Sequence, residues 1–526
     1  MGSRAVLEQE PLAAAWSWLL VLLLSIFAIA PLTYPGFFEA SSGFLPAFNA
    51  AHPQQAPDWA GTTPAAQGEG QLPYLLTWPF LHLSGSGVVA VKWGYGLAFA
   101  LGALGVYAWS RRWLGSGGGV LAAAVYTYLP WHLGTVYERG AYAEAWLWAF
   151  WPCLLWSIDH LSAGRRAYRV AAGAVGLLLL GAILWTQPGL ALLSLPVLLA
   201  YGVIADPRRR RPAIATILVI ALALLLLWVL ARVDTGTQSL YQADYLYPFQ
   251  LFSARWTLGG NAVQAADQPS FQLGVAAAGL ALVAVALWLT GRRGKPRGLG
   301  AVLGFWAVAL AVFLSLTLAW SARLWEFAGL RAFVVHPWQL LAVAGLPLAF
   351  LSGSLLRLDN RLAALPAWAG LLSLVVLSSY FYLAPEFTQV DPGTDPSAMF
   401  QPVSASQPAI VLLDYQMNEP SELEPTLAVT LTWQALAPLP DDYTVFLHVL
   451  RGADEKVAQR DSQPCDGACP TSTWVPGEIV VDRHQIALPE GAESDPLRLA
   501  LGLYLLDSGQ RAAVAGDGDT VILDAR

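Results

Sequence analysis

Long apolar runs alternate with short polar loops over the first 385 residues of the chain. Each run is long enough, or nearly long enough, to cross the hydrocarbon core of a bilayer as a helix. The runs fall at residues 12–32, 86–110, 117–131, 141–160, 169–186, 188–204, 213–232, 272–290, 299–318, 336–355 and 363–383. The pattern predicts a mostly α-helical, multi-pass membrane protein with eleven transmembrane helices.

Basic residues in the loops predict how these helices are oriented. Arginine and lysine cluster in every second loop, and such loops are typically cytoplasmic. The clusters lie at residues 111–112, 165–169, 208–211, 292–297 and 357–361. We therefore expect a cytoplasmic N-terminus, a retained first helix rather than a cleaved signal peptide, and an extracytoplasmic chain after about residue 385. Three long segments, 33–85, 233–271 and 319–335, then face outward.

The pattern changes after the last apolar run. Residues 385–408 are rich in Pro, Asp and Ser and are predicted to link residues 1–384 to a second domain at 409–526. In that domain, apolar residues alternate or form short β-rich runs, separated by Gly, Pro and Asp turns. The runs are TLAVTLTW, YTVFLHVL, EIVVDRHQIAL and LRLALGLYLL. They predict an extracytoplasmic antiparallel β-sandwich.

Composition supports a location in the cell membrane. The 526-residue chain is 56% hydrophobic and only 12% charged, with a mean hydropathy of +0.50. The formal net charge of -7 says little about partners, because the basic loops and the acidic C-terminal region are segregated. Membrane lipid is the expected surrounding, and we expect no nucleic-acid partner.

Few ionisable residues fall within or beside the apolar runs, and such residues often mark functional sites in membrane proteins. Lys92 lies early in the second run, Glu138 and Arg139 precede the fourth, and Glu144 follows one turn later. Lys92 either reaches the lipid headgroups or binds a lipid phosphate. Arg139 and Glu144 form either a local ion pair at a helix start or part of a site.

Several function classes lack support in the sequence. The seven histidines are scattered, so no metal site with histidine ligand spacing is predicted; a divalent cation held by carboxylates alone stays open. The chain has no P-loop, dinucleotide-binding motif or nucleophile elbow. An ion-coupled transporter would need acids or histidines deep in the helices, where this chain is almost uncharged.

Two of the three cysteines lie close together in the predicted outer domain. Cys465 and Cys469 flank Asp-Gly-Ala in the stretch PCDGACP. A tight turn there would bring them within disulfide distance in an oxidising compartment. The alternative is a pair of free thiols.

Five stretches of the chain resemble bacterial membrane proteins of the GT-C glycosyltransferase-like type, a family also described as 6-pyruvoyl-tetrahydropterin synthase-related membrane proteins. The resemblance spans residues 30–350, and the predicted β-sandwich also looks like the domain that often ends such chains. The stretches are GFFEASSGFLPAFN, LPWHLGTVYERGAYAEAWLWAFWPCLLW, WTQPGLALLSLPVLL, YPFQLFSARWTLGG with SFQLG, and LRAFVVHPWQLLAVAG.

The resemblance implies a transferase that moves a sugar from a polyprenyl-phosphate carrier to a glycan or protein acceptor on the outer face. A carboxylate in the first outer loop would serve as base or metal ligand. This chain departs from the family pattern there: Ser42 replaces the aspartate, Ser41 and Pro46 replace two histidines, and Asn49 replaces an arginine. The pattern of Arg139, Gly140 and Glu144 is kept.

A serine is not a general base at neutral pH, so the inherited chemistry cannot use residue 42. Either Glu39, or Asp58 or Glu69 later in the loop, supplies the carboxylate, or the protein is a catalytically silent scaffold that binds lipid-linked glycan or assists its assembly. We take Glu39 as the candidate catalytic residue. The candidate substrate-binding residues, predicted to line one outer cavity with it, are Lys92, Arg139, Glu144, Trp338 and Gln339.

Overall fold

The computed structural model describes most of both predicted regions. Its described residues are 14–38, 40, 45–51, 70–161, 166–205, 245–252, 271–291, 298–328, 330, 333–334, 336–385, 387–388, 397–404, 408–418, 426–436, 439–452, 455–474, 478–489, 497–514 and 518–524.

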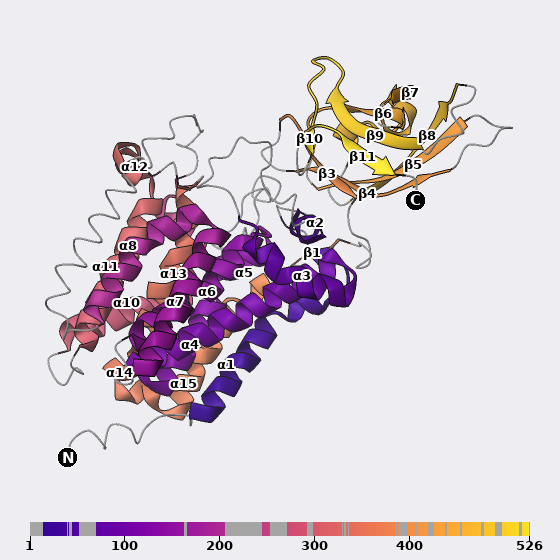
Figure 1. The fold of residues 1–526 in the computed structure, drawn as a ribbon. Coiled ribbons are helices and arrows are strands. Elements are labelled where there is room, and N and C mark those ends of the chain that lie inside the picture. Colours follow the sequence, from indigo (N-terminus) through magenta and orange to yellow (C-terminus); the bar gives the residue numbers. More distant parts are fainter. Residues whose placement is uncertain are drawn as a thin grey trace. The chain divides into compact units, whose positions relative to one another are not determined.

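Contacts divide the chain into two compact units, each described separately below. The first, which we call the helical unit, comprises Met1–Thr33, Pro64–Pro73 and Gly94–Pro385. The second, the sandwich unit, comprises Tyr34–Thr63, Tyr74–Trp93 and Glu386–Arg526. Figure 1 shows the helices of the first unit and the larger sheets of the second.

The helical unit consists of apolar helices of very different lengths. Its helices are α1 (Ala14–Ala28), most of α4 (Gly87–Thr127), α5 (Pro130–Tyr137), α6 (Tyr142–His160), α7 (Arg166–Thr186), α8 (Pro188–Ile204), α10 (Val275–Thr290), α11 (Leu299–Thr317), α12 (Ala322–Ala328), α13 (Leu341–Gly353), α14 (Leu355–Leu358) and α15 (Leu365–Ser378). Short 3-10 turns connect several of them: η1 (Ala30–Thr33), η4 (Pro248–Leu251), η5 (Ala319–Ser321), η7 (Pro337–Leu340), η8 (Asn360–Ala363) and η9 (Tyr380–Leu383).

Four helices of the described part are long and apolar enough to cross a membrane. They are Gly87–Thr127, Arg166–Thr186, Leu299–Thr317 and Pro337–Leu358. The predicted ranges other than 213–232 contain helices, although several of these are shorter than a span, and 213–232 lies outside the described residues. The count of eleven spans therefore stays a prediction.

Helix α4 covers two of the predicted runs, 86–110 and 117–131. The break predicted between them is present at Gly115, whose φ of 76° lies in the left-handed region that favours glycine. The chain stays helical on both sides, where residues 87–127 contain no proline.

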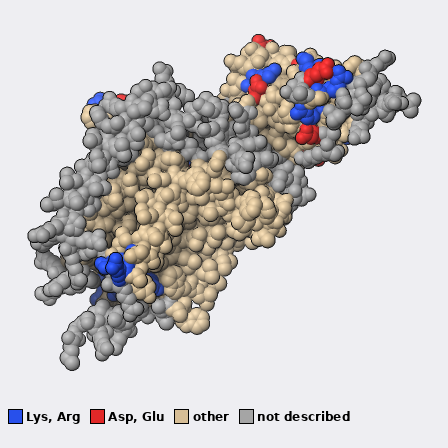
Figure 2. All heavy atoms as spheres, viewed as in Figure 1, with Lys and Arg blue, Asp and Glu red and all other residues tan. Residues whose placement is uncertain are grey.

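Helix α13 forms the core of the helical unit. All of its residues are buried, whereas α7 exposes most of its length. Helices α5, α6, α10 and α11 contact α13. On the face shown in Figure 2, a broad part of the unit's surface carries no charged side chain, and Lys and Arg gather near one end. That surface suits contact with lipid.

The sandwich unit contains two antiparallel sheets whose inner faces share one apolar core. Their orders are β10-β3-β4-β5-β8 and β11-β9-β6-β7. The strands are β3 (Ala398–Gln401), β4 (Ile410–Met417), β5 (Thr426–Ala435), β6 (Tyr443–Arg451), β7 (Glu455–Ser462), β8 (Ile479–Ala487), β9 (Leu497–Leu505), β10 (Ala513–Val514) and β11 (Val521–Asp524). Burial alternates strictly along β8, as the period-two pattern predicts.

The first sheet begins earlier than the sequence predicted. Strand β3 lies inside the proposed linker, 385–408, and pairs with β4 through Phe400 and Ile410. Phe400 is fully buried and packs edge-on against Trp433. Four residues bounded by polar chain are too few to show alternation in the sequence, and the division of the chain at residues 384 and 408 stays a prediction.

A two-stranded pairing joins the chain after α1 to the chain after the last helix. Strand β1 (Phe37–Phe38) is antiparallel to β2 (Phe387–Thr388). Both phenylalanines of β1 are buried. The same unit contains two short helices that the sequence pattern did not predict, α2 (Leu45–Ala51) and most of α3 (Leu72–Ser84).

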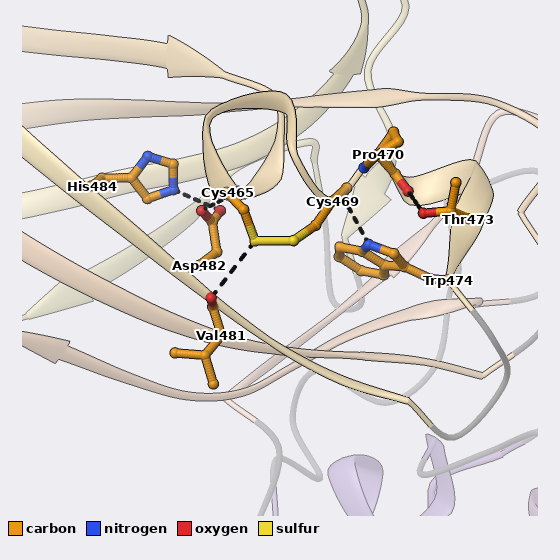
Figure 3. The surroundings of a disulfide bond; sticks show 8 residues. All are labelled: Cys465, Cys469, Pro470, Thr473, Trp474, Val481, Asp482 and His484. Atoms are coloured by element: carbon orange, nitrogen blue, oxygen red, sulfur yellow. Dashed lines mark hydrogen bonds and ion pairs between the residues drawn. A yellow bond between two sulfur atoms is a disulfide. The ribbon is translucent and has the colours of Figure 1, made fainter.

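The structure joins Cys465 and Cys469 in a disulfide, with Cα atoms 5.4 Å apart. Figure 3 shows the turn that it closes and the residues that hold this turn to β8. The backbone N–H of Cys465 donates to Asp482 (2.8 Å), whose second oxygen lies 2.7 Å from His484 Nε2. Asp482 and His484 have no exposed side-chain surface, so the pair satisfies buried polar groups beneath the turn.

A close contact between α4 and α13 generates a prediction. A Cβ on Gly118 of α4 would lie 2.8 Å from the carbonyl oxygen of Gly353 in α13, whereas a Cβ on Gly181 of α7 would meet nothing within 4 Å. We expect Gly118→Ala to cost about 1–3 kcal/mol through overpacking. Gly181→Ala should be neutral or slightly stabilising. Thermal unfolding in identical nanodiscs checks both; equal midpoints would contradict the close helix packing.

Candidate functional site

An arginine between aromatic rings is the main charged cluster among the predicted site residues of the helical unit. We call Trp131, Arg139, Glu144, Phe271 and Trp338 the arginine–aromatic cluster. They come from α5, the turn after it, α6, the chain before α10, and η7. Segments far apart in the sequence therefore meet at one place.

The turn between α5 and α6 positions the charged pair. Pro130 starts α5, where its missing N–H costs nothing. Gly140 ends the turn with a φ of 65°, and the N–H of Ala141 donates to the carbonyl of Thr135 (2.9 Å). Helix α6 then begins at Tyr142, which places Glu144 in its first turn.

Arg139 and Glu144 form a bidentate ion pair. Both terminal nitrogens of Arg139 donate to the carboxylate, each at 2.8 Å, and one also donates to the Thr135 hydroxyl at 3.2 Å. The side chains are 11% and 1% exposed. Fork-like geometry strengthens such a pair, and the positive end of the α6 dipole favours the carboxylate.

Two tryptophans cover the guanidinium. Its central carbon lies 4.5 Å from the ring centroid of Trp338 and 5.0 Å from that of Trp131. Phe271 stacks on Trp131, and His336 lies almost parallel to Trp338 at 4.7 Å. Cation–π contacts of this kind gain strength where water is excluded.

The other predicted site residues have different surroundings. Gln339 is mostly buried, and its side-chain oxygen accepts the N–H of His336 (3.1 Å), which caps η7. Lys92 belongs to the sandwich unit, where its amine donates to the Tyr34 carbonyl at 2.6 Å. Glu39, Asp58 and Glu69 lie outside the described residues. The structure therefore brings together Arg139, Glu144 and Trp338, and gives Lys92 a role in holding the chain after α1.

Sequence analysis missed a second buried carboxylate, Asp159, at the end of α6. Its two oxygens accept hydrogen bonds from the Tyr201 hydroxyl (2.9 Å) and from Trp113 Nε1 (3.2 Å). Arg112 lies 3.5 Å from it, and Trp109 donates to the same Tyr201 oxygen (2.9 Å). This network ties α4, α6 and α8 together. The signal was available, since Asp159 and Glu144 are the two acids in the run 141–160.

Within the arginine–aromatic cluster, the charges of Arg139 and Glu144 neutralise each other. Arg139 can bind an anion only if Glu144 gives way, and Glu144 can accept a proton only after leaving the guanidinium. Among the described residues, no group of three or more His, Cys, Asp or Glu side chains could hold a metal ion. The arrangement thus offers a cation, a carboxylate and aromatic faces, but all of them already engage one another.

The fold and the uncharged surface of the helical unit define an α-helical membrane protein that carries a C-terminal β-sandwich. The chain belongs to the 6-pyruvoyl-tetrahydropterin synthase related domain family of membrane proteins, whose family model matches residues 70–385. The match includes the arginine–aromatic cluster and excludes Glu39 and the sandwich strands. No curated protein shows a significant similarity to the chain.

The buried pair yields a stability prediction. Arg139→Met leaves Glu144 as an unpaired buried charge, which typically costs about 3–5 kcal/mol. Arg451→Met breaks the exposed pair with Glu455, and such pairs contribute about 0–1 kcal/mol. The double variant Arg139→Met/Glu144→Met should recover part of the loss. Unfolding midpoints in one detergent check the order; a single variant at Arg139 as stable as the Arg451 control would contradict the buried pair.

Proposed function

We propose that the protein is a GT-C-like glycosyltransferase that takes a sugar from a polyprenyl-phosphate-linked donor and passes it to a glycan or protein acceptor on the outer face of the cell membrane. The observation that carries the proposal is the arginine–aromatic cluster. Two of the stretches that carry the family resemblance contribute four of its five members. Residues 129–156 contain Trp131, Arg139 and Glu144, and residues 330–345 contain Trp338. This proposal includes the eleven-span topology with a cytoplasmic N-terminus.

The chemistry of the donor matches the side chains of the cluster. A polyprenyl-phosphate sugar combines an anionic phosphate with an apolar chain and a sugar ring. An arginine that exchanges its carboxylate partner for phosphate gains comparable charge-assisted hydrogen bonds. The faces of Trp131 and Trp338 suit a sugar ring or a prenyl chain. Donor binding would thus open the Arg139–Glu144 pair.

Transfer also requires a base for the acceptor. The acceptor oxygen attacks the anomeric carbon, its proton passes to a carboxylate, and the bond to the carrier phosphate breaks, so that the polyprenyl phosphate leaves with both bonding electrons. We assign the base to Glu39 in the first outer segment. A divalent cation near the leaving phosphate would assist the same step.

A catalytically silent scaffold is the second candidate. The closed pair favours it, because a carboxylate that holds both guanidinium nitrogens leaves no free cation for phosphate. The replacements at Ser41, Ser42, Pro46 and Asn49 point the same way. Such a protein would bind lipid-linked glycan or assist its assembly without turnover.

Carrier release separates the two candidates. Purified protein is incubated with a polyprenyl-phosphate sugar and an acceptor extract, and free carrier and bound donor are measured below the unfolding temperature. If the protein is a transferase, the unaltered protein releases carrier. The Glu39→Gln variant then binds the donor without releasing carrier, and the Arg139→Lys variant binds the donor more weakly. The exposed Arg323→Ala on α12 is the control and should match the unaltered protein.

A scaffold binds the donor without releasing carrier, and only Arg139→Lys weakens that binding. Failure of the unaltered protein to bind or cleave the donor would contradict both candidates.

A further inference from the structure

Arg111 on α4 lies beside two aromatic rings that the proposed reaction does not use. Its guanidinium carbon is 5.3 Å from the ring centroid of Trp18 on α1 and 5.8 Å from that of Tyr107, one turn earlier on α4. The two rings meet edge to face at 4.5 Å. The cation is therefore held at the junction of α1 and α4.

The charge of Arg111 is available to a ligand, whereas that of the adjacent Arg112 is partly used. Arg112 donates to the Asp159 carbonyl at 2.6 Å and lies near its carboxylate. Arg111 is exposed, and no carboxylate of the described residues forms an ion pair with it. Rings hold the guanidinium in place without neutralising it.

An apolar surface adjoins this cation along α1. One side of α1 packs on the unit, where the hydroxyls of Tyr128 and Tyr137 donate to the carbonyls of Leu24 and Ala28. The opposite side is exposed and entirely apolar between Trp18 and the end of the helix. Its exposed residues are Leu19, Leu22, Leu23, Ile26 and Phe27.

We infer that Arg111, Trp18 and the exposed side of α1 form a binding site for one anionic phospholipid. The guanidinium pairs with the lipid phosphate, and an acyl chain lies along α1. The stretch from Trp18 to Ile26 covers about 12 Å of helix rise, comparable to the upper part of an acyl chain. A zwitterionic lipid offers the same phosphate but also a cation that Arg111 repels, so the site should prefer a net negative headgroup.

Lipid retention tests the site on the full-length protein. Nanodiscs are prepared with equal amounts of phosphatidylglycerol and phosphatidylcholine of identical chains, the protein is transferred to mild detergent, and the retained lipids are quantified by mass spectrometry. The unaltered protein should retain phosphatidylglycerol preferentially. Arg111→Met should lower the ratio of the two lipids about fivefold, as expected for loss of one basic contact.

Arg361→Met is the matched control, because Arg361 is exposed and no aromatic ring of the described residues stacks on its guanidinium. The control should leave the ratio unchanged. Trp18→Leu keeps the charge and removes one ring, so it should lower the ratio by less than Arg111→Met. An unchanged ratio in Arg111→Met, or an equal fall in Arg361→Met, would overturn the site.

Discussion

Charged groups buried inside the helical unit must find their partners within the protein, because the hydrocarbon core of a membrane contains no water to solvate them. Two carboxylates of α6 illustrate this constraint. Glu144 forms an ion pair with Arg139, and Asp159 accepts hydrogen bonds from Tyr201 and Trp113. Each network links α6 to other segments of the chain, so the few charges of an apolar unit also fix how its helices pack.

The same constraint shapes the proposed chemistry. A buried charge that is fully paired is stable and unreactive, whereas one that must bind a phosphate has to exchange partners. Arg139 therefore holds the start of α6 in place and is also the residue proposed to bind the phosphate of the sugar donor. In the proposed binding of the donor, Arg139 would exchange Glu144 for phosphate, and the aromatic rings on either side would keep the guanidinium in place during that exchange.

Local patterns in the sequence predicted the regular elements well. The apolar runs matched helices wherever the structure describes them, and four predicted strands correspond to β5, β6, β8 and β9. The close spacing of Arg139 and Glu144 also indicated their pairing. These features depend on residues that are close together in the chain, so the periodicity of apolar residues and the spacing of charged ones reveal them.

Features that depend on distant residues could not be predicted in this way. The pairing of Phe38 with Phe387 joins two-residue strands with no periodic signal of their own. The hydrogen bond from Lys92 to the Tyr34 carbonyl is marked by no pattern in the sequence, because the two residues lie 58 positions apart. Asp159 was visible as a lone acid, but its partners on α4 and α8 became known only from the packing.

The central claim is that buried polar networks hold the helices of this unit together. The Tyr201→Phe variant lacks the hydroxyl that donates to Asp159 and accepts from Trp109 and Trp113. The control, Tyr168→Phe, lacks the same hydroxyl at an exposed position on α7. Thermal unfolding of both variants in the same nanodiscs is the most direct test. The account predicts a loss of about 1–3 kcal/mol for Tyr201→Phe and none for Tyr168→Phe. Equal unfolding midpoints for the two variants would contradict it.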